Sequence, residues 1–188
     1  MIYIVRHGQT DLNSARVLQG RSDSPLNAEG EAQALAAGAL FLERGVRFDY
    51  VYSSPLKRAV RTAELIAPGC RIVTDERLIE IDYGPYEGAS LEEPPAEIIT
   101  FFSDFKNNPA PEGMEQLSEV VDRAGLFLED IKDLQGVILI STHAIAMKGL
   151  LEYLTPGSNG EYWSTHIGNC EVYCAENVAG EIGIPERW

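Results

Sequence analysis

The sequence contains little histidine, cysteine or positive charge, and each shortage excludes a class of protein. Among 188 residues there are three histidines and three cysteines, and 15 basic residues face 29 acidic ones, for a net charge of −14. A small odd number of cysteines does not form a disulfide framework, so we expect a reduced, cytoplasmic setting. A chain this negative is a poor partner for nucleic acid or for an anionic membrane surface.

Several long or motif-bearing segments are also missing. No apolar run approaches the roughly 20 residues that a membrane span needs, and the first residues lack the pattern of a secretory signal. There is no Gly-x-Gly-x-x-Gly or Walker-type phosphate loop, and no Gly-x-Ser-x-Gly nucleophile elbow. Since His-x-His, His-Glu-x-x-His and Cys-x-x-Cys are absent too, we expect neither a metal nor a cofactor. The length fits one domain over residues 1–188.

Apolar runs alternate with helical patterns along the chain, which predicts a three-layer α/β/α fold with a mostly parallel sheet. Strands are expected at 1–6, 48–52, 71–74, 136–142 and 170–175. The fourth is the most apolar and should be central, and the last should lie at an edge. Helices are expected at 27–44, 54–67, 114–133 and 143–154. Asn27 and Ser54 are the expected N-caps of the first two, with Pro55 at the first helical position of the second.

Two segments lie outside this alternation. Residues 7–27 are polar and predict a long loop, and loops of that length in compact domains are usually functional. Residues 83–113 hold five of the ten prolines and predict an irregular lid or cap insertion with one amphipathic piece at 97–105. Its apolar side chains could cover an organic leaving group or pack on the domain; they are Ile98, Ile99, Phe101, Phe102 and Phe105.

Two apolar strands each end in a histidine. The first leads into Arg6-His7-Gly8 and the fourth into His143. Ligands of open α/β sheets bind outside the carboxyl ends of the strands, so neighbouring strands would bring the two imidazoles together there. Arg58 lies in the first turn of the helix expected after the second strand, where the helix dipole disfavours a cation unless an anion binds. This pattern indicates an enzyme that acts on an anion.

A carboxyl group could complete such a site. Glu80 stands between two isoleucines, and partly apolar surroundings suit a carboxyl group that donates a proton. On local sequence alone, a surface glutamate is the more frequent case.

The motifs of this sequence, taken in chain order, resemble those of the histidine phosphatase superfamily, also called the phosphoglycerate mutase-like family. The resemblance covers nearly the whole chain, because its motifs run from the first strand to the fourth. They are Arg6-His7-Gly8-Gln9-Thr10 with Asn13, Gln19-Gly20-Arg21-x-Asp23-x-Pro25-Leu26, Gly30-x-x-Gln33-Ala34, Ser53-Ser54-Pro55-Leu56-x-Arg58-Ala59-x-x-Thr62-Ala63, Leu78-x-Glu80-x-x-x-Gly84-x-x-Glu87-Gly88 and Thr142-His143.

The resemblance implies a role for each of these groups. His7 would be the nucleophile that becomes phosphorylated, and Glu80 would protonate the leaving oxygen and later activate water. No metal would be needed, because side-chain cations offset the phosphoryl charge. The phosphoryl oxygens would be held by Arg6, Arg58 and His143, with further contacts from Asn13, Gln19, Gly20 and Ala144.

Two positions depart from the family pattern, and one region distinguishes the mutases of the family from its phosphatases. Ala144 stands where glycine is common, and Lys148 stands where many members have arginine. A mutase of this type uses basic residues after the glutamate motif, but residues 86–113 contain one lysine among many acids, which are Glu87, Glu92, Glu93, Glu97, Asp104 and Glu112.

We therefore expect a phosphomonoester hydrolase acting on a small phosphorylated metabolite, as a monomer or homodimer. Phosphoglycerate mutase is the alternative, and a non-catalytic phosphate-binding module is a third possibility.

Overall fold

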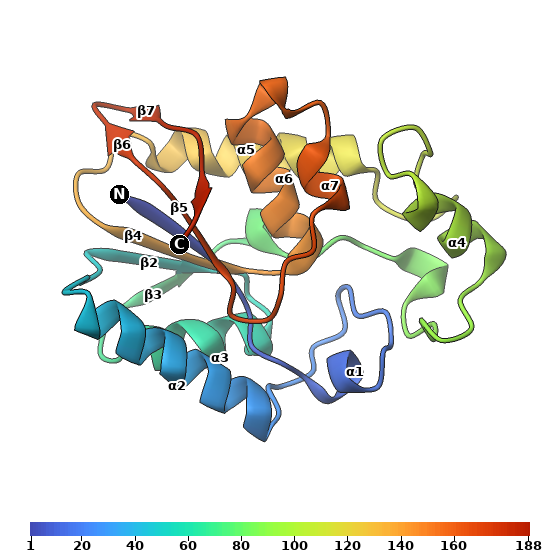
Figure 1. Ribbon diagram of the computed structural model, residues 1–188, viewed down its shortest axis with the longest axis horizontal. Coiled ribbons are helices and arrows are strands. Elements are labelled where there is room, and N and C mark those ends of the chain that lie inside the picture. The colour runs from blue at the N-terminus through green and yellow to red at the C-terminus, as the bar shows by residue number, and fades with distance from the viewer.

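The computed structural model describes residues 1–188 as a six-stranded sheet between two layers of helices (Figure 1). The strand order is β3-β2-β4-β1-β5-β8; β1 to β4 are parallel, β5 pairs antiparallel with β1, and β8 pairs antiparallel with β5. The predicted three-layer, mostly parallel architecture is thus confirmed. The strands are β1 (Ile2–Arg6), β2 (Tyr50–Ser53), β3 (Ile72–Thr74), β4 (Ile138–Thr142), β5 (Val172–Ala175) and β8 (Glu186–Arg187).

The strand expected at the edge is not at the edge. β5 pairs with β1 on one side and with β8 on the other, because the last residues of the chain return to the sheet. β4, the most apolar strand, lies between β1 and β2 as predicted, since a strand covered on both faces must be apolar throughout. Cys170 lies before β5 with a positive φ of 55° rather than within the strand.

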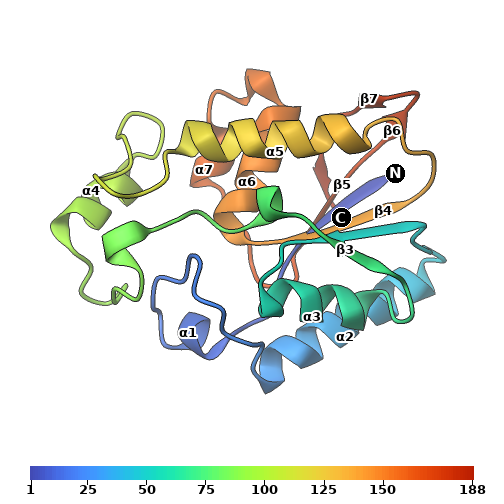
Figure 2. The same cartoon turned by 180° about the vertical axis from the view of Figure 1, so that it is seen from behind.

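The main helices cover the two faces of the sheet in pairs. In Figure 2 the pair α2 (Ala28–Glu43) and α3 (Lys57–Ile66) lies below the sheet, and α5 (Leu117–Ile131) and α6 (Ala144–Leu154) lie above it. No helix is long and apolar enough to span a membrane. The remaining elements are short: α1 (Asp11–Ser14), α4 (Ala96–Ser103), α7 (Glu161–Ser164), the ribbon of β6 (Asn177–Val178) and β7 (Glu181–Ile182), and the 3-10 turns η1 (Glu76–Leu78), η2 (Gly84–Tyr86) and η3 (Pro156–Ser158).

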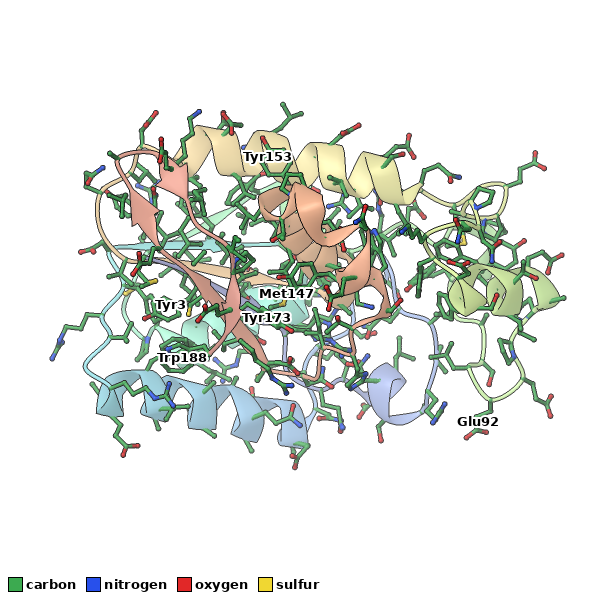
Figure 3. All side chains as sticks on the ribbon, turned by 45° about the horizontal axis from the view of Figure 1, so that its top comes forward. Tyr3, Glu92, Met147, Tyr153, Tyr173 and Trp188 are labelled. Atoms are coloured by element: carbon green, nitrogen blue, oxygen red, sulfur yellow. The ribbon has the colours of Figure 1, made fainter.

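Each face of the sheet has its own core. Between the sheet and α2, the ring of Phe41 stacks on Trp188 at 4.2 Å and meets Tyr3 edge-on at 5.2 Å. Figure 3 shows Tyr3 and Trp188 side by side there, and the partly buried Trp188 packs against this core. On the other face, Phe127 of α5 and Met147 of α6 are fully buried. Burial of each such side chain contributes about 1.5–3 kcal/mol.

The helix starts match the predictions only in part. Asn27 caps α2, because its Oδ1 accepts the N–H of Gly30 at 2.9 Å. Ser54 does not cap α3, which begins at Lys57 instead. The N–H of Lys57, which has no partner within the helix, donates to Asp23 Oδ1 at 2.7 Å. The side-chain cap of α3 therefore comes from the loop, 34 residues earlier in the chain.

Two other boundaries follow from local contacts. α5 begins at Leu117, three residues later than Met114, because Gln116 forms a capping box with Glu119. The predicted loop at 7–27 contains the short helix α1, which Thr10 and Asn13 cap reciprocally.

Residues 83–113 form a lobe beyond the carboxyl ends of the strands, which we call the lid lobe. It contains η2 and α4, and in Figure 1 it extends away from the sheet. Its apolar side chains pack onto the domain: Ile98 and Phe101 are almost fully buried, in a cluster with Ile81, Val120 and Trp163. We considered two roles for these side chains, covering a leaving group or packing on the domain. This face of α4 packs on the domain.

Candidate active site

The two histidines meet where β1 and β4 end. The strands pair in parallel with Arg6 opposite Thr142, so the next residue of each, His7 and His143, leaves the sheet at the same edge. Their ring centroids are 5.0 Å apart, and both side chains are buried. The sequence predicts this convergence, because parallel neighbours bring their carboxyl ends together.

Arg58 lies between the two imidazoles and is fully buried. Its Nε–H points to His7 Nε2 at 3.3 Å and to His143 Nδ1 at 3.1 Å. Its two terminal nitrogens each donate at 2.6 Å, to the carbonyls of Ser22 and Gly20. Burial lowers the pKa of Arg58 to about 10, which leaves the guanidinium charged at neutral pH. The loop at 7–27 thus fixes this cation with backbone carbonyls.

The hydrogen bonds define which nitrogen of each imidazole carries a proton. His7 Nδ1 lies 2.7 Å from the carbonyl of Gly8, which can only accept, so Nδ1 carries the hydrogen and Nε2 keeps a lone pair toward Arg58. His143 Nδ1 accepts from Arg58, and its Nε2 lies 2.7 Å from Ser54 Oγ. Burial, followed by the charge of Arg58, lowers the pKa of both histidines well below 6.5. Both rings are therefore neutral.

The contact between Ser54 and His143 also explains why Ser54 is not an N-cap. Its hydroxyl forms a hydrogen bond with the His143 imidazole, and Leu56 is the residue that takes the extended backbone conformation before α3. A motif that looks like a helix start is instead part of the site.

The backbone after β1 is held close to α2 and α3. The N–H of Gly8 donates to Thr62 Oγ1 at 3.0 Å, and the Thr62 hydroxyl donates to the carbonyl of Arg58 at 2.7 Å. A Cβ at Gly8 would lie 2.3 Å from the carbonyl oxygen of Gly30, so no larger residue fits. This approach positions His7 against Arg58.

Two further donors are buried without a protein acceptor. Arg6 donates through Nη1 to the carbonyl of Ile167 at 2.6 Å, but its Nε has no partner. Gln19 accepts the hydroxyl of Thr10 at 2.7 Å, and its Nε2 has no partner. Leaving a buried donor unpaired costs about 1–3 kcal/mol, and an anionic ligand would remove that cost.

Glu80 is buried, so the surface reading of this residue is wrong. Its Oε1 accepts three backbone N–H groups, from Ile81 and Ala146 at 2.9 Å and from Ile145 at 3.1 Å. Oε2 shares only the N–H of Ile145, at 3.2 Å. The carboxyl group therefore sits at the N-terminus of α6, and Ala144 is the first residue of that helix.

The other predicted contact residues have different positions. Asn13 Oδ1 accepts from Thr10 N–H at 3.2 Å and from Asn169 Nδ2 at 3.3 Å, which leaves its amide nitrogen for another partner. The N–H of Gly20 donates to the carboxylate of Glu87 at 3.0 Å, so the contact of Gly20 with the site is its carbonyl on Arg58.

Sequence reasoning missed Asn169 as a site residue. Its Nδ2 also donates to the carbonyl of His7 at 3.0 Å, and it holds the oxygen of Asn13 in place. It lies in a connection before β5 that has no motif, and only the pairing of β5 with β1 brings it to the site.

Comparison with known proteins gives a consistent result. A sequence model of the histidine phosphatase superfamily (branch 1) matches residues 2–184. The "Putative phosphoserine phosphatase 2" of Hydrogenobacter thermophilus is 33% identical over 179 residues, which cover 91% of this chain and 86% of the relative. The "Probable phosphoglycerate mutase GpmB" of Escherichia coli O1:K1 is 39% identical over 154 residues, 78% of this chain and 70% of the relative.

Solved structures show the same fold. The phosphoserine phosphatase of Entamoeba histolytica, solved as a mutant in complex with phosphoserine, superposes with a TM-score of 0.83 at 25% identity, covering 99% of this chain and 93% of that one. A mycobacterial glucosyl-3-phosphoglycerate phosphatase gives a TM-score of 0.84 at 23% identity, with 100% and 97% covered.

Proposed function

We propose that this chain, which belongs to the histidine phosphatase superfamily, hydrolyses phosphomonoesters through a phosphohistidine on His7. One observation carries the proposal: the Nε2 lone pair of a buried, neutral His7 faces the Arg58 guanidinium, and Gly8 anchors the opposite nitrogen. An imidazole held in this tautomer is a nucleophile with its attacking atom already directed at a cation that would bind the phosphoryl oxygens. The proposed substrate is a small phosphorylated metabolite.

The first displacement transfers the phosphoryl group to the protein. His7 Nε2 forms a bond to phosphorus while the bond from phosphorus to the ester oxygen breaks, and Arg6, Arg58 and the neutral His143 stabilise the equatorial oxygens. Glu80 donates a proton to the departing oxygen. We assign this proton to Oε2, because Oε1 is already occupied by three N–H groups.

The second displacement returns the protein to its starting state. The Glu80 carboxylate takes a proton from water, the water oxygen attacks phosphorus, and the bond to His7 Nε2 breaks, which releases phosphate. The free amide nitrogens of Asn13 and Gln19 and the N–H of Ala144 are the remaining donors that we assign to the phosphoryl oxygens. Each side-chain cation does electrostatic work here that would otherwise need a metal ion.

The test is hydrolysis of p-nitrophenyl phosphate with EDTA present. We expect the His7→Ala variant to lose at least about 10⁴-fold in kcat, as removal of a covalent nucleophile does in other enzymes. His166→Ala is the matched control, because the third histidine is exposed and its side chain takes part in none of the hydrogen bonds of the site. Wild-type protein incubated with substrate and quenched in alkali should carry a phosphoryl label that His7→Ala lacks. Equal rates for wild type and His7→Ala would exclude the nucleophile assignment.

Mutase activity is a second candidate, because relatives 39% identical are named as phosphoglycerate mutases. The residues of the lid lobe favour hydrolysis, since Lys106 is its one lysine and is exposed, and the lobe carries six acidic residues after Tyr86 that would oppose a bisphosphate electrostatically. Interconversion of 3- and 2-phosphoglycerate, primed with the bisphosphate, distinguishes the two. Robust turnover there would replace hydrolysis as the main activity.

A further inference from the structure

Lys148 is a buried cation that the proposed reaction does not use. It lies on α6 and is 9% exposed. Its Nζ donates to the carbonyl of Trp163 at 2.8 Å and lies 5.4 Å from the centre of the Phe105 ring. It takes part in none of the ion pairs of the protein. A buried ammonium group with one carbonyl partner has donors to spare, and a buried charge is costly unless it is paired.

The position of Lys148 relates it to the phosphoryl site. Lys148 is four residues after Ala144, so both lie on one face of α6, about 6 Å apart along the helix axis. Long side chains of a helix point back toward its N-terminus, which here is the end that carries Glu80. The charges of Glu80 and Arg6 both act on the pKa of Lys148, in opposite directions. Lys148 therefore lies about one helical turn from the end of α6 that carries Glu80.

We propose that Lys148 binds a carboxylate of the substrate, so that the preferred substrates are small phosphomonoesters that also carry a carboxyl group. This inference rests on the proposed hydrolase function and names its substrate class. The ammonium group supplies the charge, and its N–H groups not used by Trp163 supply the hydrogen bonds. The Phe105 ring and the Trp163 carbonyl both contact this ammonium group, so we expect a compact substrate.

A carboxylate fits this position better than a second phosphate. A dianionic phosphate needs more than one cation, and the other lysine nearby, Lys106 of the lid lobe, is exposed. The acidic surface of the protein would oppose a highly charged ligand. One ammonium group matches one carboxylate charge.

The experiment compares O-phosphoserine with O-phosphoethanolamine, which differ only by the carboxyl group. We expect wild-type kcat/KM to favour phosphoserine by at least about 30-fold, within the range of a charge-assisted contact of roughly 2 kcal/mol. Lys148→Met, which keeps the length but removes the charge, should lower this ratio at least tenfold, and Lys148→Arg should restore part of it. Lys106→Met is the control and should leave the ratio within twofold.

The possible outcomes separate this inference from the proposed function. Absent turnover of every phosphomonoester contradicts the proposed function. Turnover with no preference for phosphoserine, or a ratio that Lys148→Met does not change, overturns the role of Lys148 alone. Calorimetric binding of both ligands in the His7→Ala background tests the same preference without turnover.

A measurement on the unmodified protein covers the case in which Lys148→Met does not fold. Burial lowers the pKa of Lys148 to about 8, and Glu80 and Arg6 are the charged groups that act on it. Because kcat/KM reports the free enzyme, the value for phosphoserine should decrease above about pH 8, and the value for phosphoethanolamine should decrease less. Parallel pH profiles for the two substrates would overturn the proposal.

Discussion

The catalytic cradle, defined below, and the lid lobe lie next to each other but are held by different kinds of contact, polar in the first and mainly apolar in the second. The cradle, which comprises His7, Arg58 and His143 with their hydrogen-bond partners, consists of buried polar groups held mostly by backbone atoms. The lid lobe has an aromatic centre in which Phe101 and Phe105 meet at 4.9 Å, and an acidic exterior. Glu92, at its outer end in Figure 3, is exposed.

This difference separates two tasks. A cradle made of backbone carbonyls and strand ends has one geometry, because each donor has a fixed partner, and it suits a phosphoryl group common to all substrates. The lid lobe is held mostly by apolar contacts, and the bond from Gly20 N–H to Glu87 links it to the cradle. We therefore expect changes in the cradle to affect all substrates, and changes in the lobe to affect stability and substrate preference.

The largest effect is expected from Arg58. Arg58→Met removes the charge and leaves the carbonyls of Gly20 and Ser22 without their donor. We expect kcat/KM for every phosphomonoester to fall by about 10³–10⁵-fold, as for other arginines that stabilise a transferring phosphoryl group. Arg61→Met, one turn further along α3, is the control because its ion pair with Glu31 is exposed. A loss limited to one substrate would contradict the division of tasks.

The effect of Glu80 should depend on the leaving group. Glu80→Gln cannot donate its proton, so we expect kcat for alkyl phosphates to fall by about 10²–10⁴-fold. Hydrolysis of p-nitrophenyl phosphate should fall much less, because nitrophenolate leaves without protonation. Glu76→Gln is an exposed control in the preceding turn. An equal loss for both substrates would assign Glu80 a structural role at the start of α6.

A change in the lid lobe should affect stability more than chemistry. Phe101→Ala removes a ring that is 1% exposed, and truncation of a buried phenylalanine costs about 3–5 kcal/mol. We expect faster hydrogen exchange over residues 84–113 while kcat for p-nitrophenyl phosphate changes less than about tenfold. Ile99→Ala, on the same helix but 54% exposed, should change little. Loss of all activity together with the lobe would show that the two regions fold as one unit.

The smallest effect is a pH dependence of stability that the cradle alone produces. Because the pKa of His7 and of His143 lies well below 6.5 in the folded protein, the unfolded chain binds more protons than the folded one below about pH 6.5. Stability should therefore fall as the pH decreases from about 6.5 toward 5, by up to about 1.4 kcal/mol per pH unit for each histidine.

Urea unfolding at several pH values measures this slope. The double variant His7→Gln/His143→Gln should flatten it, whereas His166→Gln should leave the contribution of the cradle in place. An unchanged slope in the double variant would show that the two imidazoles are not the groups that titrate.

Much of the fold could be predicted from local patterns. The apolar run of β4 predicted a central strand. The two histidines that follow strands were expected at one edge of the sheet if their strands were parallel neighbours, which they are. The capping residue Asn27 acts within its own helix turn, so its role was also readable. These features depend on residues close together in the chain, or on the general geometry of parallel sheets.

Contacts between distant segments were not readable in the same way. Asp23 caps α3 in place of Ser54, and Ser54 instead bonds His143, 89 residues later. Asn169 reaches the site only because β5 pairs with β1. No local pattern specifies such partners, because each side chain could satisfy its hydrogen bonds in several ways until the tertiary structure selects one.

The sequence alone determined which reactive groups the protein has: two histidines and two arginines at the ends of strands or the start of a helix, and one glutamate among isoleucines. Only the tertiary structure decided that Glu80 is buried on the first N–H groups of α6, and that Lys148 is buried without a carboxylate partner. Burial and pairing are set by packing between segments that are far apart in the chain, and they convert residue types into charged, neutral or unpaired groups.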